Sequence, residues 1–154
     1  MQPRMNYYQA APEALKPMLD MEAYIKTCGL EHKLIELVKT RASQINGCAY
    51  CLHMHTKDAR AAGESEQRLY LLNAWEESQL YTPRERAALH WTEALTLVSE
   101  THAPDEAYEA VKAQFKPKEI VDLTLLISTI NAWNRIAIGF RAVHPEDSKH
   151  KAAA

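Results

Sequence analysis

The sequence predicts an all-α protein with about six to seven helices. Its 154 residues include four glycines, and most of the seven prolines stand where a helix can begin. Runs of Ala, Leu, Glu, Lys and Arg favour helix, and no segment carries the turn signal of a β-hairpin. A chain of this length buries about two-thirds of its unfolded surface, so we expect one domain over residues 1–154 with a single core.

Three helices are expected in the first 63 residues. Gly29 stops the first helix, in which Pro17 disturbs the opening turns. The second carries apolar residues at helical spacing until Asn46-Gly47 breaks it, and the third begins with the cysteines and ends at Gly63. The expected ranges are 12–28, 31–45 and 48–63.

Three further helices are expected before residue 115. Ser65 begins a short one, and Thr82 can cap the next, with Pro83 at the first helical position and Glu85 completing a capping box. Pro104 introduces the third. The expected ranges are 65–73, 82–101 and 104–114.

The last predicted helix runs from Pro117 to about Phe140. Its segment 121–130 is rich in β-branched residues, as a strand would be, but the apolar pattern continues far beyond usual strand length. The uncharged stretch 123–134 is too short to span a membrane. We therefore expect a helix that is buried or lies at a subunit contact.

Composition and charge disfavour several classes of partner. Charged residues make up 25% of the chain and the net charge is −2, which gives no electrostatic preference for nucleic acid or an anionic membrane. The first eight residues lack the apolar run of a signal peptide, so we expect a cytoplasmic protein. In that compartment a close cysteine pair indicates catalysis or metal binding. Residues 145–154 are expected to form a flexible tail.

Cys48, Cys51 and His55 form the most informative cluster of the sequence. At about 100° per residue these three side chains lie within roughly 60° of one another on one helix face. Two helical cysteines three residues apart have Cα atoms about 5 Å from each other, so a disulfide can form and open without unfolding the helix. This geometry favours redox chemistry. Zinc binding by the two cysteines, His55 and a carboxylate is an alternative, as are inert core thiols.

Glu36 is predicted to reach His55 from the preceding helix. If the break at Asn46-Gly47 folds the two helices into an antiparallel pair, Glu36 and His55 lie roughly 15 Å and 12 Å from it, at nearly the same level. Glu36 can then orient the imidazole, whose other nitrogen takes the Cys51 proton. Alternatively, Glu36 pairs with Lys33 or Lys39 on its own helix.

Two arguments disagree about which cysteine attacks. The positive end of the helix dipole favours Cys48, but contributes about 0.3–1 kcal/mol. A base within hydrogen-bond reach removes a proton specifically, and His55 is placed to serve Cys51. We therefore expect Cys51 to be the nucleophile.

The spacing of Glu36, eleven residues, Cys48-Ala49-Tyr50-Cys51, three residues and His55 resembles the alkylhydroperoxidase D (AhpD)-like family of the carboxymuconolactone decarboxylase-like superfamily. Flanking segments 41–47, 56–60 and 131–135 are also similar, and the resemblance extends over about 34–143. It implies an all-α fold, homo-oligomers such as trimers or hexamers, and peroxide reduction in which Cys51 attacks, Cys48 resolves, and Glu36 with His55 relays the proton.

One residue departs from that family's pattern. Better-studied members carry a second histidine where this chain has Tyr50, and a phenol, with a reference pKa near about 10, does not readily shuttle protons at neutral pH. Thiol–disulfide exchange is then expected to form a larger part of the activity. Tyr50, His53 and Asn131 are expected around the relay, and Cys28 as a structural thiol.

The sequence therefore predicts a peroxide reductase that uses no bound cofactor and no metal. An external dithiol, carried by a lipoyl-bearing or thioredoxin-like protein, is expected to reduce the disulfide. Two alternatives stay open: a general thiol–disulfide oxidoreductase with little peroxidase turnover, and a non-catalytic oligomeric redox sensor. A decarboxylase is disfavoured because the best-supported residues build a thiol relay.

Overall fold

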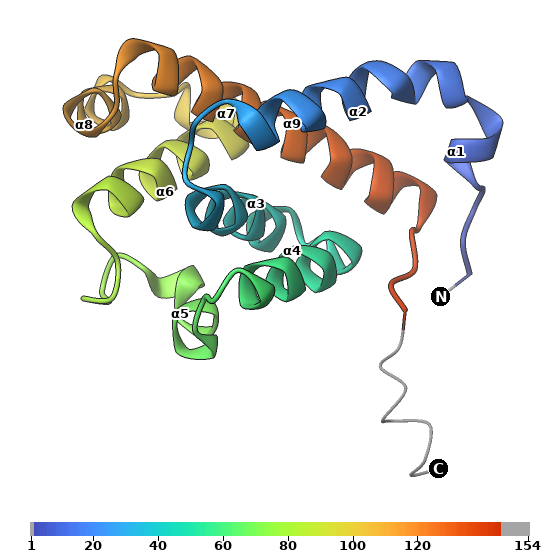
Figure 1. Ribbon diagram of the computed structural model, residues 1–154, viewed down its shortest axis with the longest axis horizontal. Coiled ribbons are helices and arrows are strands. Elements are labelled where there is room, and N and C mark those ends of the chain that lie inside the picture. Colours follow the sequence, from blue (N-terminus) through green and yellow to red (C-terminus); the bar gives the residue numbers. More distant parts are fainter. Residues whose placement is uncertain (1, 146–154) are drawn as a thin grey trace, which may run out of the picture.

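The computed structural model describes residues 2–145, whose regular elements are all helices (Figure 1). The prediction of an all-α fold is confirmed. Of the predicted tail, residues 146–154 lie outside the described part. The helices are α1 (Tyr7–Ala10), α2 (Pro12–Thr27), α3 (His32–Asn46), α4 (Ala49–Ala61), α5 (Glu66–Tyr70), α6 (Pro83–Thr96), α7 (Val98–Thr101), α8 (Asp105–Gln114) and α9 (Pro117–Phe140), with a 3₁₀ turn, η1, at Leu72–Ala74.

Two short elements, α1 and α7, make the helix number larger than predicted, and α1 places the cysteines at the start of the fourth helix instead of the third. Helix α1 has four residues, too few for an apolar period, and is held by the Asn6 side chain, which accepts a hydrogen bond from the Gln9 amide. The helix predicted over 82–101 is interrupted at Leu97, where Thr101 Oγ1 donates to the Ala94 carbonyl. Such single turns depend on local polar contacts that hydrophobic periodicity does not report.

Helix α3 is the centre of the molecule and packs against α4, α6 and α9. The core beside it is formed by apolar residues of α2, α3, α6, α8 and α9, among which Val38, Leu123 and Leu126 are fully buried. Each such side chain contributes about 1.5–3 kcal/mol relative to an exposed one. Within residues 2–145, no helix is both long and apolar enough to cross a lipid bilayer.

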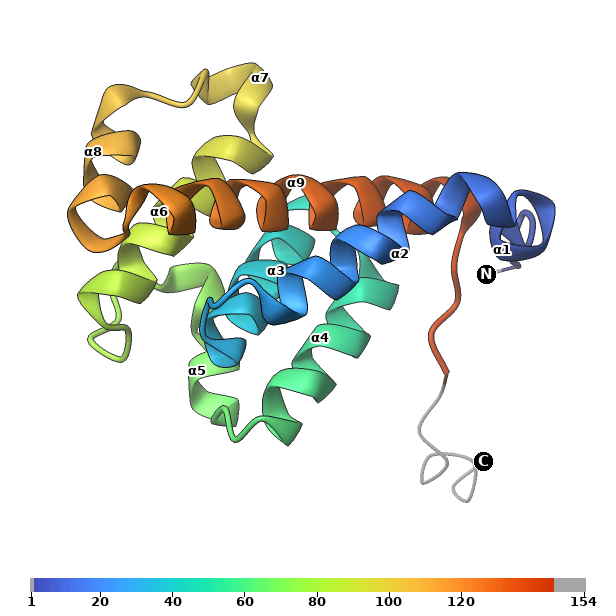
Figure 2. The ribbon, with the colours of Figure 1, turned by 45° about the horizontal axis from the view of Figure 1, so that its top comes forward.

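Helix α9 crosses the molecule, and α2 packs against it (Figure 2). Tyr24 Oη of α2 donates to Asp122 Oδ1 of α9 at 2.8 Å. Near the other end of α9, the Arg4 amide donates to the Phe140 carbonyl at 3.0 Å, and Tyr7 packs on the Phe140 ring. These contacts bring the N-terminal segment against the C-terminal end of α9.

A buried polar network joins the C-terminal end of α3 to α9. Asn46 Nδ2 donates to Asn131 Oδ1 and Asn134 Oδ1, at 2.9 and 2.8 Å. Asn134 Nδ2 donates to Ser43 Oγ, and Asn131 Nδ2 donates to Thr96 Oγ1. Because buried polar groups are costly when left unpaired, this network fixes the end of α3 immediately before the cysteines.

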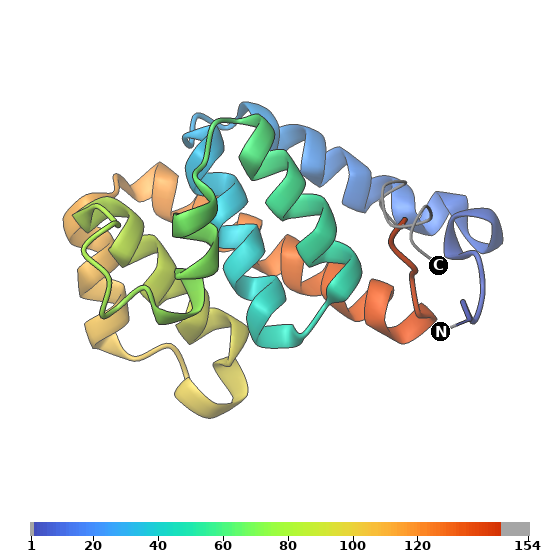
Figure 3. The same ribbon diagram turned by 90° about the horizontal axis from the view of Figure 1, so that it is seen from below.

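The turn between α3 and α4 folds the two helices back on each other (Figure 3). Gly47 ends α3 with φ 68°, a left-handed conformation that favours glycine. Cys48 then serves as the N-cap of α4, its Sγ accepting from the Cys51 amide at 3.4 Å. The local sequence thus places both cysteines at the first turn of α4.

Candidate active site

Cys48 and Cys51 are joined by a disulfide across the first turn of α4, with Cα atoms 5.4 Å apart. Both residues are almost fully buried, at 1% and 2% exposure. They differ in what they face, because Cys51 lines a cavity and Cys48 does not. The disulfide therefore presents one sulfur-bearing residue to the cavity and keeps the other behind it.

Glu36 and His55 meet across the α3–α4 pair. His55 Nδ1 lies 3.0 Å from Glu36 Oε2, and both residues are buried, at 5% and 6% exposure. The neighbouring lysines make other contacts: Lys33 donates to the Gly63 carbonyl, and Lys39 pairs with Glu22. The structure thus brings Glu36 to the imidazole and not to a cation of its own helix.

The hydrogen bond to Glu36 leaves the other ring nitrogen, Nε2, for a second partner. If Nδ1 carries the proton that it shares with the carboxylate, Nε2 is a base. His55 lies four residues after Cys51 on the same face of α4. In this disulfide form Cys51 Sγ is bonded to Cys48, so the sulfur has no proton to give.

A cavity of about 250 Å³ lies between α1, α2, α3, α4 and α9 and contains the candidate residues. Its lining combines charged groups with apolar and aromatic ones. Desolvation by burial raises the pKa of both Tyr7 and Tyr8, so these phenols remain protonated at neutral pH. The lining residues are Tyr7, Tyr8, Leu19, Glu22, Lys26, Glu36, Lys39, Tyr50, Cys51, Met54, His55, Asp58, Trp133 and Ala137.

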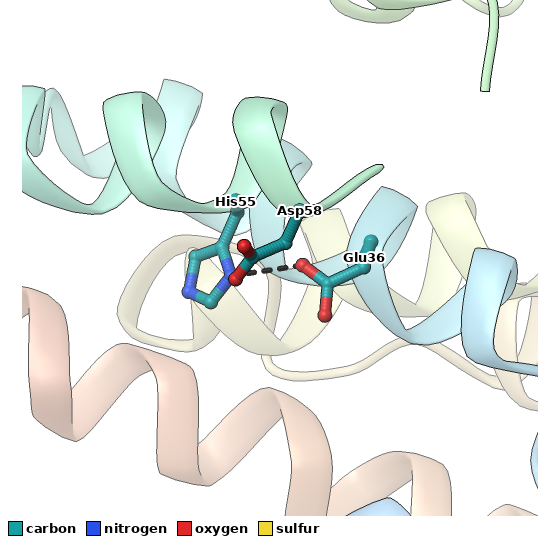
Figure 4. Close-up of side chains that lie close together, drawn as sticks. All are labelled: Glu36, His55 and Asp58. Atoms are coloured by element: carbon teal, nitrogen blue, oxygen red, sulfur yellow. Dashed lines mark hydrogen bonds and ion pairs between the residues drawn. The ribbon is translucent and has the colours of Figure 1, made fainter. Parts of the chain in front are cut away.

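Asp58 joins Glu36 and His55 in the cavity (Figure 4), although the sequence argument did not select it. One atom from each of the three side chains lies within 4.8 Å of the other two, close enough to share a metal ion. Neither cysteine belongs to this group, so the alternative zinc site of Cys48, Cys51, His55 and a carboxylate is not assembled among residues 2–145. Asp58 lies three residues after His55 on the same helix face, and this spacing was the signal in the sequence that could have identified it.

The remaining predicted residues separate into different environments. Tyr50 lines the cavity. His53 is half-buried outside it and stacks on His144, with ring centroids 5.0 Å apart. Asn131 belongs to the network between α3 and α9. Cys28 is half-buried, and its Sγ donates to the Ile25 carbonyl at 3.2 Å.

Comparison with known proteins assigns the chain to a family. The model of the carboxymuconolactone decarboxylase family matches residues 12–94, more than half of the chain, and this range contains Glu36, both cysteines of the pair and His55. The protein belongs to the carboxymuconolactone decarboxylase family. The match begins earlier than the resemblance seen over 34–143 and ends before α9.

Two proteins are similar to this chain over nearly its whole length. The uncharacterised protein YdfG of Bacillus subtilis is 49% identical over 138 residues, covering 90% of this chain and 94% of its own. A crystal structure from Agrobacterium tumefaciens, of a protein of unknown function suggested to be the antioxidant defence protein AhpD, is 50% identical with a TM-score of 0.92. The alignment covers 95% of this chain and 100% of that one. The fold is therefore AhpD-like.

The same fold also occurs in a protein with another activity. The crystal structure of the debrominase Bmp8 has a TM-score of 0.77 at 16% identity, over 94% of this chain and 76% of its own. At that identity the similarity concerns the fold alone. Members of the superfamily are enzymes, and this carboxymuconolactone decarboxylase family chain carries a cysteine pair of which one member faces its cavity.

Proposed function

We propose that this protein is a thiol-dependent peroxide reductase in which Cys51 attacks the peroxide and Cys48 resolves the product. The hydrogen bond between His55 Nδ1 and Glu36 Oε2 carries the proposal, because it lies in the cavity that Cys51 lines. It fixes the orientation of a base four residues from a cysteine, the arrangement that an activated nucleophile requires.

The proposed reaction balances over two thiols. His55 takes the Cys51 proton, and the thiolate attacks the distal oxygen of the hydroperoxide; a sulfur–oxygen bond forms and the oxygen–oxygen bond breaks. The leaving alkoxide takes the proton from His55 and departs as an alcohol, leaving a sulfenic acid on Cys51. The Cys48 thiol then attacks this sulfur, which releases water and forms the disulfide seen in the structure.

An external dithiol completes the cycle by supplying two electrons and two protons to the disulfide. Because Cys48 and Cys51 are 1% and 2% exposed, a flat protein surface cannot reach either sulfur in this conformation. A dithiol on a flexible arm, as in a lipoyl-bearing protein, suits the cavity better than the surface-borne pair of a thioredoxin-like protein. We also propose a homo-oligomeric assembly, which sedimentation analysis of the purified protein tests.

Hydroperoxide consumption with a panel of dithiols tests the proposed function. We expect Cys51→Ser to abolish the first turnover, because the attacking sulfur is gone. Cys48→Ser should react once and retain a sulfenic acid that a dimedone probe labels. Equal first-turnover rates in Cys51→Ser and the natural protein would reject the assignment.

Tyr50 favours a second candidate function, general thiol–disulfide exchange. It lines the cavity where a second histidine of the better-studied family members would stand, and a phenol is a poorer proton carrier at neutral pH. Reduction of a small disulfide by the protein and a dithiol, measured beside hydroperoxide consumption, ranks the two activities. A redox sensor would show neither turnover, since it is oxidised once and then stops.

A further inference from the structure

Lys39 is a buried cation in the wall of the cavity. It lies on α3 one turn after Glu36, and its side chain is 5% exposed. Its Nζ is 2.6 Å from Glu22 Oε2 of α2, whose side chain is 19% exposed. Burying an ammonium group is costly even when a carboxylate is beside it, so a lysine at this position requires an explanation.

The pair with Glu22 leaves part of the ammonium group unsatisfied. An ammonium group has three donors, and among residues 2–145 Nζ makes its hydrogen bond to Glu22 alone. The remaining donors belong to a side chain that lines the cavity. They can therefore bind an acceptor that enters it.

The antiparallel arrangement of α3 and α4 places Lys39 within about one helical turn of the level of Cys51. Counted from the break at Gly47, Lys39 lies roughly 12 Å back along α3, whereas Cys51 and His55 lie roughly 6 Å and 12 Å forward along α4. Lys39 is thus at the level of His55 and about one helical turn from the level of Cys51. All three residues line the same cavity.

The other charges of the cavity make this cation necessary for an anionic occupant. Three carboxylates also line the cavity: Glu22, which is paired with Lys39, and Glu36 and Asp58, which oppose negative charge. Lys26 is exposed to solvent, which screens its charge. Lys39 is the buried cation of the lining.

We propose that Lys39 forms an oxyanion site beside Cys51, with Glu22 holding the ammonium group in place. The ligand class is an anionic oxygen on the molecule that Cys51 attacks. In the peroxide reaction, which rests on the proposed function, this is the leaving oxygen: as the oxygen–oxygen bond breaks, negative charge develops there before the proton arrives from His55. A fixed cation that binds this charge lowers the barrier.

Alkylation of Cys51 tests the site independently of peroxidase activity. In a Cys28→Ser/Cys48→Ser protein, Cys51 is the remaining thiol, and its sulfur displaces iodide from either iodoacetate or iodoacetamide. The two reagents differ by one negative charge. The ratio of their rate constants therefore reports the cation beside the sulfur and cancels changes in thiolate fraction, which affect both reagents equally.

Lys39→Gln should lower the iodoacetate to iodoacetamide ratio about fivefold, the scale of one screened unit charge a few ångströms away. Lys39→Arg should restore the ratio, since it keeps the charge. Glu22→Gln should raise it, because the amide keeps a hydrogen-bond acceptor but no longer neutralises the ammonium group. Lys33→Gln is the matched control: Lys33 lies three residues before Glu36, as Lys39 lies three residues after it, and is outside the cavity.

An unchanged ratio in both Lys39→Gln and Glu22→Gln overturns the oxyanion site, as does an equal decrease in Lys33→Gln, which would indicate a diffuse field. If Lys39→Gln fails to fold, as judged by circular dichroism, the Glu22→Gln result decides. Lys39→Gln should slow the reaction with tert-butyl hydroperoxide more than the reaction with a peracid, because the leaving group of a peracid needs less stabilisation. If Lys39→Gln changes the alkylation ratio as expected but leaves the rates with peroxides unchanged, the peroxidase proposal is rejected and the oxyanion site is kept.

Discussion

The two walls of the cavity are built from the chain in different ways. One wall is the α3–α4 pair, in which Glu36, Cys51 and His55 come from 20 consecutive residues. The other combines Tyr7 and Tyr8 of α1 with Trp133 of α9, from opposite ends of the sequence. The first wall holds a carboxylate, a sulfur and an imidazole, which carry protons and electrons in the proposed reaction, whereas the second holds aromatic rings.

This difference teaches where each property of the site is specified. The groups of the proposed reaction sit on one helical hairpin, whose geometry follows from helical spacing and a glycine turn. The aromatic wall depends on packing over more than a hundred residues of separation. Changes in the first wall should therefore affect chemistry, and changes in the second should affect which substrate is accepted.

Glu36→Gln should give the largest effect. Without the carboxylate, His55 loses the partner that orients it, and the first-turnover rate with hydroperoxide should fall about 10²-fold, the lower range for general acid–base catalysis. Stopped-flow measurement on the reduced protein gives this rate. The pH profile of Cys51 alkylation should also move to higher pH.

The matched control for that change is Glu109→Gln, which removes an exposed carboxylate paired with Lys112, far along the chain in α8. Its first turnover should equal that of the natural protein. If the two variants behave alike, the hairpin does not carry the chemistry and the comparison of the two walls fails.

Asn134→Ala should cause the next largest effect, on stability. Asn134 is fully buried, and its loss removes the hydrogen bonds that it makes with Asn46 and Ser43, which should cost about 2–3 kcal/mol of unfolding free energy. Urea denaturation measures this. Asn73 is exposed, so the control Asn73→Ala should leave the free energy of unfolding almost unchanged. An equal loss of stability in both variants would show that the network does not join the two walls.

Gly47→Ala tests the turn that closes the hairpin. With φ 68°, an alanine at this position should cost about 1 kcal/mol, although a Cβ there would contact nothing within 4 Å. Gly139→Ala is the control: it lies within α9, again with nothing within 4 Å, and should stabilise by about 0.5–1 kcal/mol. We expect the two substitutions to shift the melting temperature in opposite directions. Shifts in the same direction would contradict the role given to the turn.

Tyr8→Ala should give the smallest effect and should appear in substrate preference. Tyr8 stacks on Trp133 with ring centroids 6.4 Å apart, and both line the cavity. Losing one ring should raise KM for cumene hydroperoxide about threefold, the scale of one aromatic contact, and should leave KM for hydrogen peroxide unchanged. Tyr70→Ala, on a 72% exposed side chain, serves as control. A decrease in kcat for both peroxides would instead place Tyr8 in the chemistry.

The elements that the sequence predicted well share a local cause. The capping box of Thr82 and Glu85 is present, and α9 runs from Pro117 to Phe140 despite its β-branched segment. The approach of Glu36 to His55 was also anticipated, because both distances are counted from one break in two regular helices. Helix α1 and the interruption at Leu97 were missed, since each rests on one or two polar contacts.

The cavity residues that escaped sequence analysis had a different cause. Asp58 and Lys39 lie one helical turn from His55 and Glu36, so spacing could have suggested them. Glu22, Tyr8 and Trp133 could not be found in this way, because α2, α1 and α9 reach the cavity through tertiary packing. Asn131, expected near the relay, lies instead in the network that holds α3 to α9.

The sequence by itself determined the helical class, the turn at Gly47 and the placement of Cys48, Cys51, Glu36 and His55 on one hairpin. These follow from short-range rules: helical period, backbone conformation and fixed rise per residue. The tertiary structure alone decided that Cys51 and not Cys48 faces a cavity, and that Lys39 is buried there against Glu22. Burial and ion pairing depend on which surfaces of distant helices meet, and that is set by the packing of the whole core.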